Sequence, residues 1–84
     1  MSYTVLLSSQ AEKFYKKLRK NIRARVREAL IGLEDEPHAG KRLHGDLKGN
    51  YSLRVGKLRV IYTILERDKA VYVVAIGPRE VIYR

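Results

Sequence analysis

The sequence predicts an α+β fold. An N-terminal strand and a two-helix hairpin come first, and a mainly antiparallel sheet of three to four strands follows, with the helices on one of its faces. Two stretches with the spacing of amphipathic helices precede Pro37. Three β-rich stretches come after it, and strands grouped after helices are typical of the α+β class. A chain of 84 residues has room for one core, so residues 1–84 are expected to form a single domain.

The first helix is expected to begin at Ser9, after a short β-rich run at residues 3–7 that predicts the first strand. Ser9 and Glu12 have the spacing of a capping box, in which each side chain accepts a hydrogen bond from the other residue's backbone amide. An apolar stripe with helical spacing follows, formed by Ala11, Phe14, Tyr15 and Leu18.

The second helix is expected to be capped by Asn21 and to end before Pro37, because the residue before a proline disfavours helical geometry. Its apolar face carries Ile22, Val26, Ala29, Leu30 and Leu33. Two helices so close in sequence indicate a helical hairpin. Their many Lys and Arg residues are interpreted as a solvated face that contributes long-range attraction rather than chemistry.

Residues 37–50 are polar and glycine-rich, and they predict a loop long enough to have a function. Leu43 and Leu47 are expected to anchor this loop to the core. His38 and His44 also lie here, but they lack helical i, i+4 spacing and no cysteine supports them. They are interpreted as surface histidines, and neither a metal nor a cofactor is expected.

A hairpin over residues 51–62 forms the centre of the predicted sheet. Apolar and polar residues alternate from 51 to 55, which is the pattern of a strand with one buried face. Gly56 and Lys57 predict the turn, because glycine tolerates the positive φ that a tight hairpin requires. A second strand rich in β-branched and aromatic residues runs over 58–65 and includes Arg59.

The last predicted strand is the apolar run Val71 to Ile76, which is expected to be central in the sheet and buried on both faces. A turn at residues 67–69 precedes it. Gly77 and Pro78 are expected to break it. Residues 79–84 then close the chain as an extended tail or a further short strand.

The charge balance points to phosphate-bearing or acidic partners. The chain has 18 Lys and Arg against 9 Asp and Glu, a net charge of +9. RNA, DNA or an acidic protein would each suit such a surface. No apolar run approaches the roughly 20 residues that span a bilayer, and the first residues do not have the pattern of a signal peptide. A cytoplasmic protein without a membrane partner is therefore expected.

Two stretches carry a resemblance to a known family. G-N-Y-S-L-R-V-G-K-L-R-V-I-Y at 49–62 and V-A-I-G-P-R-E-V-I-Y at 74–83 resemble the RelE/ParE toxin superfamily of toxin–antitoxin modules. The resemblance implies a ribosome-dependent endoribonuclease that cleaves mRNA in the ribosomal A site and so inhibits translation. It also implies neutralisation by a cognate, RelB-like antitoxin, with DNA contacted only indirectly through the antitoxin complex.

The resemblance also assigns candidate catalytic residues. Arg59 matches the arginine that holds the scissile phosphate, and Arg79 matches the arginine before the C-terminal tail. Tyr83 matches the tyrosine that contacts the substrate nucleotide. Arg54 matches one of two basic residues on the preceding strand.

This sequence departs from the family pattern at Ser52 and Pro78. Ser52 falls at the second basic position, and a serine cannot act as a cationic phosphate clamp. Pro78 replaces a basic residue or histidine of some members and removes a possible proton donor. Lys48, Arg54 and Lys57 are the candidate RNA-binding residues.

The residue chemistry supports this assignment but leaves alternatives open. Arginines can stabilise the negative charge that develops when a 2′-hydroxyl attacks the adjacent phosphate. Arg54 and Arg59 would converge only if their register places them on one face. Tyr83 offers a stacking surface, but a phenol with a pKa near 10 is a poor base.

Plain surface roles are the alternative for each residue. Arg54 and Arg59 could pair with Glu66 or Asp68, Arg79 with a local acid, and Tyr83 could pack on the sheet edge. At the level of function, the alternatives are a ParE-like toxin that binds gyrase without nuclease activity, and an inactive member that only binds its antitoxin.

Overall fold

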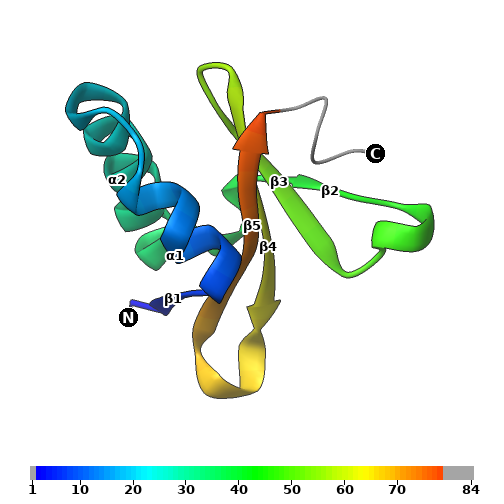
Figure 1. The fold of residues 1–84 in the computed structure, drawn as a ribbon. Helices are drawn as coiled ribbons and strands as arrows, with labels where there is room; N and C mark the ends of the chain where they lie inside the picture. Colours follow the sequence, from blue (N-terminus) through cyan, green and yellow to red (C-terminus); the bar gives the residue numbers. More distant parts are fainter. Residues whose placement is uncertain (1, 79–84) are drawn as a thin grey trace.

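Two helices cover one face of a five-stranded sheet in the computed structural model, which describes residues 2–78 (Figure 1). The elements follow in the order β1 (Thr4–Leu7), α1 (Ser9–Lys16), α2 (Lys20–Asp35), β2 (Lys41–Arg42), β3 (Asn50–Val55), β4 (Leu58–Leu65) and β5 (Ala70–Pro78). Short 3-10 turns lie at Pro37–Ala39, Gly45–Leu47 and Glu66–Asp68. The predicted α+β arrangement is confirmed: in the sequence, both helices come after the first strand and before the other strands.

The strands lie side by side in the order β1-β5-β4-β3-β2. β1 pairs with β5 in parallel, and the other three pairs are antiparallel. A parallel pair needs a long connection, and both helices and strands β2 to β4 lie between β1 and β5 in the sequence. β4 therefore lies at the centre of the sheet, and β2 forms the edge farthest from β1.

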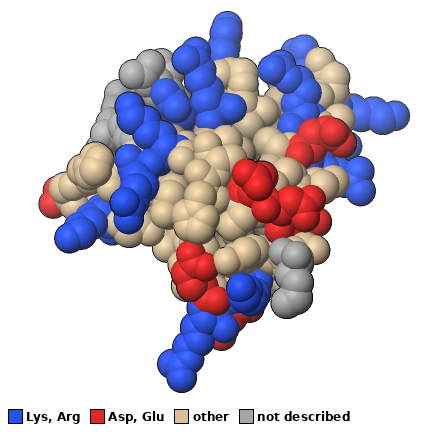
Figure 2. Space-filling view, turned by 180° about the vertical axis from the view of Figure 1, so that it is seen from behind, with Lys and Arg blue, Asp and Glu red and all other residues tan. Residues whose placement is uncertain are grey.

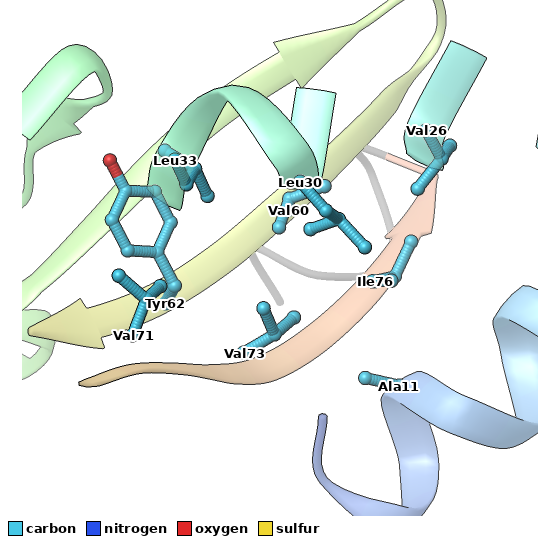
Figure 3. Close-up of a cluster of buried hydrophobic side chains, with 9 residues drawn as sticks. All are labelled: Ala11, Val26, Leu30, Leu33, Val60, Tyr62, Val71, Val73 and Ile76. Carbon is cyan, nitrogen blue, oxygen red and sulfur yellow. The ribbon is translucent and has the colours of Figure 1, made fainter. Parts of the chain in front are cut away.

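The core lies between α2 and the middle strands, as Figure 3 shows. Val26, Leu30 and Leu33 of α2 project toward the sheet. The sheet contributes alternate residues of β4 and β5, as expected for strands with one covered face. These are Val60, Tyr62, Val71, Val73 and Ile76, all fully buried.

Helix α1 begins at Ser9, as predicted, but its N-cap is Ser8, so the capping role predicted for Ser9 was wrong. The Ser8 hydroxyl oxygen accepts from the amide of Ala11 at 3.1 Å. Ser8 still has the extended backbone of β1, with φ −67° and ψ 167°, whereas Ser9 is already helical. An N-cap needs non-helical geometry, and this decides between the two serines.

The expectation that Asn21 caps α2 was also wrong. The helix begins at Lys20, and Arg19 occupies the N-cap position without a side-chain hydrogen bond. Arg23 supports the tight link between the helices instead, because its Nη1 donates to the carbonyl of Leu18 at 3.2 Å. The predicted end of the helix before Pro37 is confirmed, since α2 stops at Asp35.

Strand β5 is longer and more exposed than predicted. It includes Gly77 and Pro78, which pair with β4 instead of ending the strand. Tyr72 and Val74 are 37% and 39% exposed, so burial on both faces was wrong. No helix in the described part of the chain covers this second face, called here the open face (Figure 1). A shift of register between Ile61 and Tyr62 makes Val74 the extra residue of a bulge.

The predicted loop at 37–50 contains the edge strand β2, and Tyr62 holds it in place. The Tyr62 hydroxyl donates to the carbonyl of Pro37 at 2.8 Å and accepts from the amide of Gly40 at 2.9 Å. Leu43 is half-buried, but Leu47 is exposed, so the prediction that Leu47 anchors the loop was wrong. Hydrogen bonds between the Tyr62 side chain and the backbone of this segment therefore help to fix it, together with the half-buried Leu43.

Within residues 2–78, neither helix combines the length and apolar character needed to cross a bilayer. His, Cys, Asp and Glu side chains in the same residues form no group of three that could hold a metal ion.

Candidate nucleic-acid interface

Arg54 of β3 and Arg59 of β4 lie directly opposite each other. Directly opposed residues of an antiparallel pair share a face, with Cβ atoms roughly 4.5–5.5 Å apart. Their strand neighbours Leu53, Val55 and Leu58 pack toward the helices and the core. The two arginines therefore project from the open face. The register places them on one face of the sheet, which is the condition under which they were expected to converge.

The hairpin turn holds Arg54 close to the tip. Gly56 has a φ of +60°, which confirms the predicted role of this glycine in the turn. The Nε of Arg54 donates to the carbonyl of Gly56 at 3.3 Å. Lys57 is exposed at the tip, where it lines an apolar groove of about 510 Å³ between the hairpin and the helices. Lys57 thus lies between the two arginines in the sequence, but in the structure it borders a separate groove.

Strand β5 places a glycine directly opposite Arg59. The residue opposite Arg59 on β5 is Gly77, which has no side chain. Pro78 pairs with Leu58 at the end of the described chain. No β5 side chain therefore lies directly across from Arg59, which is half-buried, and Gly77 itself is buried.

Ser52 lies on the same face as Arg54, two residues before it, and is 4% exposed. It occupies the position where the family resemblance predicts a second basic residue. The residue opposite Ser52 on β2 is Lys41, which is exposed. Sequence reasoning missed Lys41, because a strand of two residues has no periodic pattern to reveal which face its side chains share.

Lys48 does not join this cluster. It lines a different cleft, of about 400 Å³, together with Arg42, His44 and Tyr51. Arg42 is paired with Tyr51, a residue that packs toward the core, so this cleft belongs to the other side of β2. Arg79 and Tyr83 lie outside the described residues.

The acids at the end of β4 have other partners. Glu66 accepts a hydrogen bond from the Tyr3 hydroxyl at 2.7 Å and lies 3.2 Å from Nε2 of His38. This bond to Glu66 is the main cause of a raised pKa at Tyr3. Glu66 and Asp68 follow β4, whereas Arg59 is near its start, and a strand rises about 3.3 Å per residue. Glu66 therefore does not pair with Arg54 in this structure.

The charge distribution agrees with a basic surface around the hairpin. Seen from behind, Lys and Arg side chains lie along the whole upper part of the molecule, on its left and on its right, and this includes the level where Figure 1 places the β3–β4 turn (Figure 2). The five strands carry no Asp or Glu at all in the described residues. Every formal charge on the sheet is consequently positive.

Comparisons with known proteins identify the family. The model of the family "ParE toxin of type II toxin-antitoxin system, parDE" matches residues 5–83. Toxin RelG of Mycobacterium tuberculosis is 36% identical over 86 residues, which cover 100% of this chain and 99% of RelG. Toxin RelE of the same organism is 34% identical over 84 residues, covering 98% of this chain and 87% of RelE.

Solved structures agree with this assignment. A chain in the crystal structure of the M. tuberculosis toxin–antitoxin complex RelBE2 superposes with a TM-score of 0.86 at 32% identity, over 94% of this chain and 100% of that one. The archaeal RelE–RelB complex from Pyrococcus horikoshii gives 0.77 at 31% identity, over 94% of this chain and 97% of that one. The chain therefore belongs to the RelE/ParE superfamily of toxins of type II toxin–antitoxin systems.

Proposed function

We propose that this toxin is a ribosome-dependent endoribonuclease that cleaves mRNA and so inhibits translation. The observation that carries the proposal is the pairing of Arg54 with Arg59 on the open face. Two guanidinium groups side by side suit a phosphodiester, because each presents planar N–H donors that match phosphate oxygens. Two like charges placed directly opposite each other also repel, and a bound phosphate relieves that repulsion.

In the proposed reaction, the 2′-oxygen of the RNA bonds to the neighbouring phosphorus and the bond to the 5′-oxygen breaks. The 2′-hydroxyl proton leaves to a base, and the departing 5′-oxygen takes up a proton. Arg54 and Arg59 stabilise the extra negative charge on the phosphorane in between. They do not act as bases, because a guanidinium stays protonated at all accessible pH values.

The proton transfers need groups other than these arginines. His38 contacts Glu66 and Tyr51, and His44 lines the cleft on the other side of β2. Arg79 and Tyr83 are proposed, from the family resemblance, to complete the site. Support comes from the path of β5, since Gly77 pairs with Arg59 two residues before Arg79 in the sequence.

Such a limited acid–base set predicts slow cleavage of free RNA. A ribosome that holds the mRNA in line with the arginines would supply the missing orientation, an effect worth roughly 7–11 kcal/mol in favourable intramolecular cases. This is the physical reason to propose the ribosome and A-site mRNA as partners.

We also propose a RelB-like antitoxin as the neutralising partner. The toxin chains of two RelB–RelE complexes share this fold at 31–32% identity. The net charge of +9 favours an acidic partner segment that folds on the toxin surface. Contact with DNA is then expected only through the antitoxin.

Primer extension on a defined mRNA, with and without ribosomes, tests the nuclease proposal. We expect discrete cuts only with ribosomes, and we expect Arg59→Ala to lose at least about a hundredfold in rate, the usual range for one preorganised charge-stabilising group. Arg27→Ala, which removes an exposed cation from α2, is the matched control and should cleave normally. Normal cleavage by Arg59→Ala would refute the assignment.

Gyrase binding without nuclease activity is the second candidate, because the matching family model describes ParE toxins. In that case no mRNA is cut, supercoiling by gyrase is inhibited, and Arg59→Ala keeps its toxicity. Absence of both activities would leave an inactive member that binds its antitoxin.

A further inference from the structure

We propose that Lys41 binds the RNA phosphate next to the one held by Arg54 and Arg59, so that the three side chains form one phosphate track across the open face. The inference rests on the proposed RNA substrate. Lys41 is opposite Ser52, Ser52 shares its face with Arg54, and Arg54 is opposite Arg59. The pairing register alone therefore places the three cations on one side of the sheet.

The spacing of these cations suits consecutive phosphates. Arg54 is the diagonal neighbour of Lys41 across β2 and β3, a relation that separates residues by roughly 7–8 Å. Arg59 lies one strand farther on, toward the centre of the sheet. Long Lys and Arg side chains at this spacing can hold two phosphates one nucleotide apart.

Nothing acidic interrupts the track on the described strands. The formal charges of the sheet are Lys41, Arg42, Arg54 and Arg59, and three of the four share the open face. Ser52, which lies between Lys41 and Arg54, is small, neutral and buried. A row of like charges is unfavourable in the free protein, and it favours a ligand with regularly spaced negative charges.

The backbone of Lys41 is fixed while its side chain is exposed. The preceding residue, Gly40, donates its amide to the Tyr62 hydroxyl at 2.9 Å. A Cβ at Gly40 would lie 2.5 Å from that hydroxyl oxygen and 2.9 Å from the carbonyl oxygen of Ser52. β2 therefore approaches β3 and β4 more closely than a side chain at position 40 would permit, and Lys41 has a defined starting point from which to reach a phosphate.

Lys41 is a positioning residue, because it is placed one phosphate away from the reacting atoms. Contacts to the RNA backbone set register and affinity but carry no base information. Loss of Lys41 should weaken binding to all RNA sequences alike. It should raise the toxin concentration that half-saturates programmed ribosomes and leave the maximal cleavage rate close to that of the wild type.

The neighbouring residue provides the control for the test. Arg42 is on the same two-residue strand, is also exposed and carries the same charge, but it is paired with Tyr51 and belongs to the other side of β2. Arg42→Ala therefore changes the net charge as Lys41→Ala does, without touching the track. Lys41→Arg keeps the cation and should retain binding.

The experiment is fluorescence anisotropy of the full chain with a single-stranded oligoribonucleotide that carries one 2′-deoxy nucleotide to block cleavage, at a series of salt concentrations. We expect Lys41→Ala to bind roughly tenfold more weakly than Arg42→Ala, as for loss of a hydrogen bond between charged groups. The slope of log K against log salt should fall by about 0.7, the share of one phosphate contact on a single strand.

Equal losses in Lys41→Ala and Arg42→Ala, an unchanged salt slope in Lys41→Ala, or no binding by the wild type would each overturn the inference. This readout is separate from cleavage. Selective loss of binding in Lys41→Ala together with no ribosomal cleavage by the wild type would support the track and refute the nuclease. Cleavage by the wild type, together with a normal half-saturating concentration in Lys41→Ala, would support the nuclease and refute the track.

Discussion

Gly40 shows how a single residue positions the candidate site. Its amide hydrogen-bonds to Tyr62, and its missing side chain lets β2 lie against the carbonyl of Ser52. Its φ of −75° is open to any residue, so the requirement for glycine comes from space and not from backbone strain.

We expect Gly40→Ala to lower the free energy of unfolding by about 1–3 kcal/mol, the usual cost of an overpacked contact. Gly32→Ala is the control, because a Cβ there meets nothing within 4 Å and alanine favours the helix by roughly 0.5–1 kcal/mol. Urea unfolding of both variants measures the difference. The reverse order of their midpoints would contradict the packing argument.

Tyr62 gives a prediction about pH. Burial raises the pKa of Tyr62 above its ordinary value, and the hydrogen bond from Gly40 opposes that rise. The folded protein thus holds this proton more tightly than the unfolded chain does. The associated stability is complete below pH of about 10 and is lost as the pH rises through the higher folded value.

We expect the urea midpoint of the wild type to fall more steeply above pH of about 10 than that of Tyr62→Phe, which has no proton to lose at this position. At neutral pH, Tyr62→Phe should be less stable by about 1–3 kcal/mol, because the carbonyl of Pro37 and the amide of Gly40 lose their partner. Tyr72→Phe, altered on the open face, should follow the wild type. Parallel pH profiles for wild type and Tyr62→Phe would count against a raised pKa.

Among the elements, α1 depends on a cap that also joins it to the sheet. The Ser8 hydroxyl accepts from Ala11 and donates to the carbonyl of Val74 at 2.7 Å. The same side chain thus begins the helix and satisfies the backbone at the bulge of β5.

Replacement of Ser8 by alanine should cost about 0.5–2 kcal/mol of stability, the range for loss of an N-cap. Ser9→Ala should stay within about 0.5 kcal/mol, because Ser9 is an exposed residue of the first helical turn. Thermal or urea unfolding of the two single variants gives the comparison. A larger loss of stability in Ser9→Ala than in Ser8→Ala would indicate that Ser9 is the N-cap.

The β3–β4 hairpin is the element that assembles the arginine pair. Its two-residue turn sets the register, and a slip by one residue would send one arginine toward the core face. The alternation of residues 51–55 and the Gly56 turn were predictable from sequence, and both are confirmed. A two-residue turn at Gly56 and Lys57 pairs Arg54 with Arg59, and the structure confirms this register and shows which face of the sheet the pair occupies.

On the scale of the whole molecule, the main feature is the excess of positive charge. With a net charge of +9, long-range attraction should speed encounter with any acidic partner. We expect the association rate with a RelB-like antitoxin to fall at least about tenfold between low and physiological salt, while the dissociation rate changes much less. Stopped-flow measurements at several salt concentrations test this, and a rate independent of salt would contradict electrostatic steering.

The sequence by itself determined much of the local structure. Helical spacing located α1 and α2, Pro37 marked the end of α2, and the Gly56 turn located the central hairpin, because each is a property of neighbouring residues. The excess of Lys and Arg, a property of composition alone, predicts an anionic partner. The family resemblance added candidate residues, of which Arg79 and Tyr83 lie outside the described part of the chain.

Only the tertiary structure decided what depends on distant residues. Strand β2 is held against the sheet where Gly40 hydrogen-bonds to Tyr62 and lies close to the carbonyl of Ser52. A strand of two residues has no sequence pattern that would reveal it. The exposure of Tyr72 depends on where the helices pack, which no pattern within β5 records. The alignment of Lys41, Arg54 and Arg59 depends on two registers. The Gly56 turn sets the register of β3 with β4, but only long-range hydrogen bonds and packing set that of β2 with β3.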